Sequence, residues 1–86
     1  MQKSITLDEL GSAELARVIL NVAGKLSNRW VSARKITSEV RNVYSYRGFD
    51  IVADNNLVQH IGYILKDNNL ITHKKRTTTG MKYFLK

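Results

Sequence analysis

The chain has 86 residues, no cysteine, and 14 lysine and arginine residues against 7 acidic ones, giving a formal net charge of +7 and a pI of about 10.0. This length predicts a single domain spanning 1–86. The lack of cysteine excludes disulfides and thiolate metal sites. No apolar run approaches the roughly 18 residues of a membrane span. The positive charge indicates a polyanionic partner, while the alternative is a surface that is simply basic.

The first predicted helix spans about 7–28. Thr6 followed by Glu9 has the spacing of a capping box at its start. Gly11 can interrupt the helix, with Ser12 as a second N-cap, because a glycine in a helix interior costs about 1 kcal/mol relative to alanine. Its apolar positions keep the helical period: Leu15, Val18, Ile19, Val22, Ala23 and Leu26. We expect this helix to act as scaffold and as the surface of a possible homodimer.

A short extended segment and a second helix follow. Trp30 beside the β-branched Val31 predicts a very short strand, and we expect Trp30 to pack in the core rather than stack on unpaired bases. Ser32 then caps a helix over about 33–43. Residues 44–53 contain a turn signal and predict a long turn, whose aromatic residues either pack over the second helix or form a patch for a partner: Tyr44, Tyr46 and Phe49.

The third predicted helix, about 55–67, has two chemically different faces. Apolar residues recur at helical spacing on one face: Leu57, Ile61, Ile64 and Leu65. The other face is poor in acids and rich in side chains that donate and accept hydrogen bonds: Asn55, Asn56, Gln59, His60, Tyr63 and Lys66. Such a face is suited to contact with base edges, while the alternative is an ordinary polar helix surface.

The C-terminal residues predict two strands, about 70–76 and 81–86, joined by a turn. Alternation places Met81, Tyr83 and Leu85 on one face of the last strand, and Lys82, Phe84 and Lys86 on the other. We expect a hairpin with a packed base and a cationic tip formed by Lys74, Lys75 and Arg76. The alternative is that these cations only keep the hairpin soluble and protect its strand edges.

The order of helix, short strand, helix, helix and two-stranded hairpin resembles the winged helix-turn-helix superfamily over essentially the whole chain. Its most specific local piece is VQHIGYILKDNNLI (58–71), which looks like a recognition helix passing into the first wing strand. NRWVSARKI (28–36) with GYILK (62–66) is similar to the CaiF/GrlA group of enterobacterial activators, and TTGMKYFLK (78–86) to the wing end of PapI-type pilus-operon regulators. The implied fold class is α+β, a winged helix-turn-helix with a three-helix core and a C-terminal two-stranded β-hairpin wing.

The resemblance implies that the third helix enters the major groove of duplex DNA while the wing follows the backbone or the minor groove. Asparagine and glutamine pair with adenine N6 and N7. The predicted base-reading residues are Asn55, Asn56, Gln59, His60 and Tyr63. Cations and hydroxyl groups contact phosphates. The predicted backbone-contacting residues are Arg34, Lys35, Arg47, Lys66, Lys74, Lys75, Arg76, Thr77, Thr78, Thr79 and Lys82.

We therefore expect a cytoplasmic, nucleoid-associated transcriptional regulator that binds duplex DNA with sequence preference. Two alternatives stay open: a winged-helix protein-interaction module in a larger nucleoprotein assembly, and an RNA-binding domain. The sequence offers no support for an enzyme, a cofactor, a membrane partner or a small-molecule ligand. A metal site is not expected, because His60 and His73 lie far apart with no acid at ligand spacing.

Overall fold

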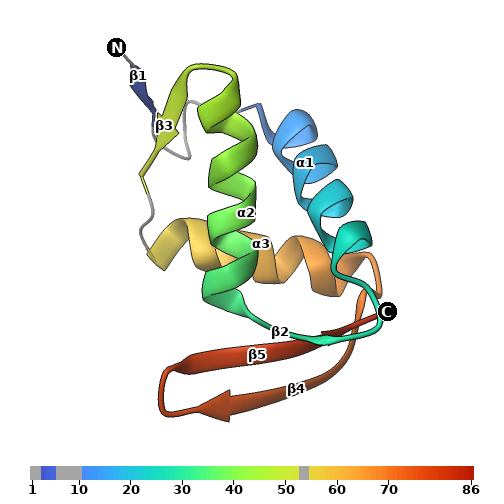
Figure 1. Ribbon diagram of the computed structural model, residues 1–86. Helices are drawn as coiled ribbons and strands as arrows, with labels where there is room; N and C mark the ends of the chain where they lie inside the picture. The colour runs from blue at the N-terminus through green and yellow to red at the C-terminus, as the bar shows by residue number, and fades with distance from the viewer. Residues whose placement is uncertain (1–2, 6–10, 53–54) are drawn as a thin grey trace.

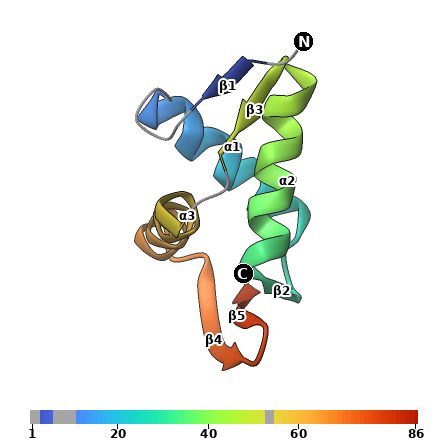
Figure 2. The same ribbon diagram turned by 90° about the vertical axis from the view of Figure 1, so that its left-hand side faces the viewer.

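The computed structural model describes residues 3–5, 11–52 and 55–86, and this part of the chain is α+β (Figure 1). Its elements in chain order are β1 (Lys3–Ile5), α1 (Ser12–Lys25), β2 (Trp30–Ser32), α2 (Ala33–Tyr46), β3 (Phe49–Ile51), α3 (Asn55–Asp67), β4 (Ile71–Thr77) and β5 (Gly80–Leu85). An antiparallel sheet has the strand order β2-β5-β4, and β1 pairs in parallel with β3. Figure 2 views α3 nearly end-on, with the β4–β5 hairpin below it.

One hydrophobic core joins the three helices to the base of the antiparallel sheet. The periodic apolar positions predicted for the helices supply most of it, which confirms that part of the sequence analysis. Its fully buried residues include Leu15 and Ile19 from α1, Ile36 and Val40 from α2, Leu57, Ile61 and Leu65 from α3, and Leu85 from β5. Because this core takes one side of α3, the opposite side of that helix is left for other contacts.

The first helix is shorter than predicted at its C-terminal end. It ends at Lys25 instead of residue 28, and Asn28 adopts a left-handed backbone conformation with φ of 61°. A left-handed residue cannot continue the helix, so the chain turns there into β2. At the other end the N-cap is Gly11, not Ser12. The capping box of Thr6 and Glu9 lies outside the described residues.

The predicted long turn at 44–53 is wrong, because α2 continues to Tyr46 and β3 follows. Gly48, with φ of 87°, makes the tight turn between them. Arg41 of α2 secures β3, since its Nε donates a hydrogen bond to the Ile51 carbonyl oxygen at 3.0 Å. On the far side β3 pairs with β1 in the register Phe49 to Lys3. This pairing joins segments distant in sequence, so local patterns could not predict it.

The aromatic residues of this segment separate into buried and exposed ones. Tyr44 belongs to the core, whereas Tyr46 is 95% exposed and Phe49 is 36% exposed. Burial, together with the nearby Glu14 carboxylate, raises the pKa of the Tyr44 phenol above its usual 10.0. Glu14 also forms an ion pair with Arg47, and this pair links the start of α1 to the end of α2.

Candidate nucleic-acid interface

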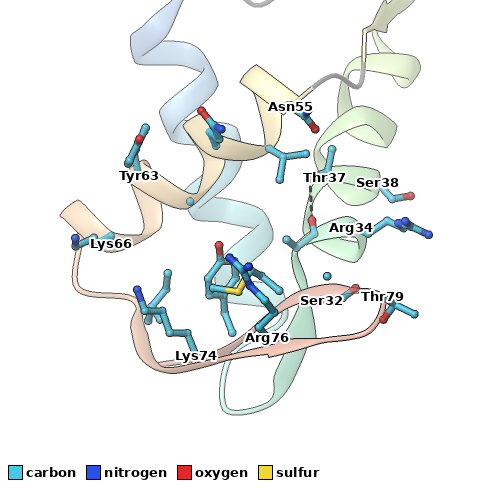
Figure 3. Close-up of a pocket in the computed structure, with 18 of the residues that line it drawn as sticks. Ser32, Arg34, Thr37, Ser38, Asn55, Tyr63, Lys66, Lys74, Arg76 and Thr79 are labelled. Atoms are coloured by element: carbon cyan, nitrogen blue, oxygen red, sulfur yellow. Dashed lines mark hydrogen bonds between the residues drawn. The ribbon is translucent and has the colours of Figure 1, made fainter.

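A groove of about 1140 Å³ lies between α2, α3 and the β4–β5 hairpin (Figure 3). From α3 it is lined by Asn55, Val58, Gln59, Gly62, Tyr63 and Lys66. From α2 and the residue before it, the lining residues are Ser32, Ala33, Arg34, Thr37, Ser38 and Arg41. The hairpin supplies Ile71, Thr72, His73, Lys74, Arg76, Thr79, Gly80, Met81 and Tyr83. We refer to this surface below as the α3 groove.

The side of α3 that lines the groove is opposite the buried side. Asn55, Gln59 and Lys66 follow one another at spacings of four and seven residues, which places them along one stripe of the helix. Gly62 lies in the same stripe, and a Cβ atom at this position would be 3.3 Å from the Tyr83 hydroxyl oxygen. The absence of a side chain at Gly62 therefore leaves room for the Tyr83 hydroxyl group beside α3.

The hairpin presents two cations to the groove from one face of β4. Lys74 pairs across the strands with Tyr83, and Arg76 pairs with Met81. Figure 3 shows Lys74 and Arg76 on the hairpin below α3, which carries Asn55, Tyr63 and Lys66. The predicted cationic tip is wrong, because the turn lies at residues 78–79 and the cations lie along the body of β4. Arg76 and Lys74 thus occupy the wall of the groove.

Two predicted phosphate-contacting lysines lie on the other face of the hairpin. Lys75 and Lys82 are directly opposite each other on β4 and β5, and neither lines the groove. The Lys75 Nζ lies 4.4 Å from the centre of the Trp30 ring. Trp30 is 42% exposed, so the expectation that it packs in the core is wrong. The short strand β2 turns this side chain to the face of the sheet that the helices do not cover.

The start of α2 contributes some of the residues that the sequence predicted. The Ser32 hydroxyl accepts a hydrogen bond from the Lys35 backbone N–H at 3.0 Å, which confirms Ser32 as the N-cap. Arg34 lines the groove, whereas the Lys35 ammonium forms an ion pair with Glu39 at 3.1 Å and does not line it. Ser38 also lines the groove and was missed, although its spacing of four residues from Arg34 places both on one side of the helix.

Three further predicted residues do not line the groove. Arg47 is at the opposite end of α2, where it pairs with Glu14. Asn56 is exposed beside the groove but does not line it. The His60 Nε2 is buried and has no hydrogen-bond partner among the described residues. One nitrogen of the half-buried His60 ring is therefore turned into the protein, and a base contact by this residue stays a prediction.

The threonines at the end of the hairpin have different roles. The Thr77 hydroxyl donates a hydrogen bond to the Gly80 carbonyl oxygen at 2.8 Å and lies 3.2 Å from the Thr79 hydroxyl. Thr77 therefore stabilises the turn, Thr79 lines the groove, and Thr78 is exposed. Of the three, the hydroxyl group of Thr79 is the one placed to meet a ligand in the groove.

The charge of the α3 groove has a single sign. The cations that line it are Arg34, Arg41, Lys66, Lys74 and Arg76. Among the described residues that line it there is no aspartate or glutamate, and Arg41 alone of these cations has an ion-pair partner, Asp50. Like charges gathered around one concave surface create a strong local potential that attracts a polyanion.

Comparison of the chain with protein-family models, with curated proteins and with solved structures finds no match. Within residues 3–5, 11–52 and 55–86, no helix has the length and apolar character needed to span a bilayer. The same part of the chain contains no group of three or more histidine, cysteine or acidic residues arranged to hold a metal ion.

Proposed function

We propose that the protein is a winged-helix transcriptional regulator that binds duplex DNA with sequence preference through the α3 groove. The observation that carries this proposal is that Asn55 and Gln59 line the same acid-free groove as Lys74 and Arg76. The arrangement of three helices with a β2-β5-β4 sheet is compatible with a winged-helix layout and supports the resemblance found in the sequence.

The two kinds of side chain in the groove serve two kinds of DNA contact. Asn55 and Gln59 occupy the N-terminal half of α3 and can each form paired hydrogen bonds with an adenine, worth about 1–3 kcal/mol of discrimination. Arg34, Lys66 and Arg76 surround them and neutralise phosphates, which fixes the position of α3 without reading sequence. Tyr63 lines the same groove, and the exposed Asn56 adjoins Asn55 and extends this surface.

A single domain of this size offers only roughly 600–1,000 Å² of DNA interface. We propose that two copies bind adjacent half-sites, because such an interface gives limited specificity alone. Selection of bound sequences from a random duplex library tests this directly. A palindrome or direct repeat supports two copies, whereas a single short motif contradicts them.

Replacing Arg76 with glutamine is expected to weaken binding to all duplexes alike. Each lost phosphate contact makes the negative slope of log K against log salt shallower by about 0.9, since one fewer counterion is released. Fluorescence anisotropy of a labelled duplex at about 50 and 200 mM salt measures both the affinity and this slope.

The control for Arg76→Gln is Lys25→Gln, which removes the same charge from the last turn of α1, outside the groove. It should retain the wild-type salt slope. Equal losses in the two variants would show that binding reflects total charge and not the α3 groove. If the unaltered protein binds no duplex even at low salt, the proposed function is wrong.

A further inference from the structure

The antiparallel sheet carries a row of three rings, one from each strand, on the face that bears Lys75 and Lys82. His73 belongs to this row through its ring contacts with Trp30 and Phe84, and it also borders the α3 groove. Trp30 of β2 pairs with Phe84 of β5, which pairs with His73 of β4. The ring centroids are 5.6 Å apart for Trp30 and Phe84, 6.3 Å for His73 and Phe84, and 6.5 Å for Trp30 and His73. Trp30 is 42% exposed, His73 is exposed and Phe84 between them is half-buried, so the two outer rings of the row are open to solvent.

A second row, two residues before Phe84 in β5 and two residues after His73 in β4, consists of cations. Lys82 lies directly opposite Lys75, whose Nζ is 4.4 Å from the centre of the Trp30 ring. Like charges directly opposite each other on neighbouring strands destabilise a sheet. No described acidic side chain forms an ion pair with either lysine. The arrangement is therefore unfavourable for the protein alone and becomes favourable when an anion lies between the two ammonium groups.

We propose that this outer face, formed by Trp30, His73, Lys75, Lys82 and Phe84, is a second nucleic-acid site that binds single-stranded DNA. The exposed rings of Trp30 and His73, with Phe84 between them, offer unpaired bases a surface for stacking. Stacking of a base on an aromatic side chain contributes about 1–3 kcal/mol irrespective of sequence. Lysines two residues away can hold the phosphates between those bases. An acidic peptide would contact the two lysines through its carboxylates, but its acidic side chains would not stack on the row of rings.

The rings and the cations act together during binding. In the free protein the Lys75 ammonium covers part of the Trp30 ring as a cation–π contact. A base that stacks on Trp30 takes the place of this ammonium, which then moves to an adjacent phosphate. Duplex DNA has no unpaired bases, so it does not gain the favourable free energy of stacking on these rings. The choice of DNA over RNA rests on the proposed function of the α3 groove.

Trp30 is the one tryptophan of the chain, so its fluorescence reports on this face without a label. A dT oligonucleotide of about 12 nucleotides lies within the usual length of single-strand sites. Addition of this oligonucleotide is expected to quench the Trp30 emission and to saturate. An rU oligonucleotide of the same length and an oligoglutamate peptide are titrated in parallel. Tighter binding of rU than of dT, or equal quenching by the peptide, would overturn the assignment.

Phe84→Leu keeps the fluorophore and removes one ring of the row. We expect its Kd for the dT oligonucleotide to rise about fivefold or more, because a stacking contribution of about 1 kcal/mol or more is lost. Its Kd for duplex DNA is expected to stay within about twofold of the wild-type value, since the α3 groove is unchanged. Trp30→Leu, followed by anisotropy of a labelled dT oligonucleotide, should weaken single-strand binding similarly.

Arg76→Gln is the matched control, because it lies next to Lys75 on the opposite face of β4. It should weaken duplex binding and leave the Trp30 quenching by dT largely intact. Thermal unfolding followed by circular dichroism checks that each variant is folded. Absence of quenching by dT, or equal weakening of single-strand and duplex binding in folded Phe84→Leu, overturns the proposal. A failure of duplex binding alone leaves quenching in place and instead contradicts the proposed function of the groove.

Discussion

Leu65→Ala is expected to lower the free energy of unfolding by roughly 2–5 kcal/mol. Leu65 is fully buried, with 0% of its surface exposed, and it belongs to the core on the inner side of α3. Removing its side chain loses apolar burial and leaves a cavity that well-packed neighbours fill only in part. Proteins of this kind have a total stability of roughly 5–15 kcal/mol, so the variant should lose a large fraction of its stability.

Urea denaturation followed by circular dichroism measures the effect of Leu65→Ala. The matched variant is Leu20→Ala, because Leu20 is a helical leucine of α1 that is only partly buried. It should lose clearly less stability than Leu65→Ala. A loss below about 1 kcal/mol for Leu65→Ala would mean that α3 is not anchored in the core as described.

Combined replacement of Asn55 and Gln59 by alanine is expected to abolish most of the preference among duplex sequences. Each amide can contribute about 1–3 kcal/mol of discrimination through paired hydrogen bonds to a base, whereas the surrounding cations attract any duplex. The ratio of the Kd values for a scrambled and a selected duplex should therefore fall by about tenfold or more, while the Kd for the scrambled duplex changes little.

The control for the amide replacements is Asn42→Ala, an exposed asparagine of α2 that does not line the groove. It should retain the full ratio between the selected and scrambled duplexes. Retention of that ratio in the Asn55 and Gln59 double variant would show that sequence is read elsewhere, or through the shape of the DNA. Both proteins should unfold at similar temperatures, because the replaced side chains are exposed.

The sequence predicted the helices and the core better than the connections between them. Leu57, Ile61 and Leu65 follow the helical period, and burial of one face is a local property that periodicity reports directly. The pairing of β1 with β3 joins residues 3–5 to 49–51, and no local pattern records such a contact. The predicted long turn at 44–53 failed for this reason.

The sequence indicated which types of residue form the candidate site, but it did not show that the basic residues of the hairpin lie on two different faces. Lys74, Lys75 and Arg76 appeared in the sequence as one basic cluster, yet strand alternation sends Lys75 to the face opposite the other two. The position of the hairpin turn depends on whether β4 ends at Arg76 or at Thr77. The conformational propensities of threonine and glycine do not decide between these two residues. His60 follows the polar stripe of α3 closely in sequence but lies at its buried edge.

The most direct test of the central claim is a map of amide chemical-shift changes as a selected duplex is added to the isotopically labelled protein. We expect the largest changes at Asn55, Gln59 and Gly62 of α3 and at Lys74 and Arg76 of β4, because these residues line one groove. The exposed residues around Tyr46, at the far end of α2, should change little. Changes concentrated around Tyr46 and β3, with the α3 groove unaffected, would contradict the proposal that this groove holds the DNA.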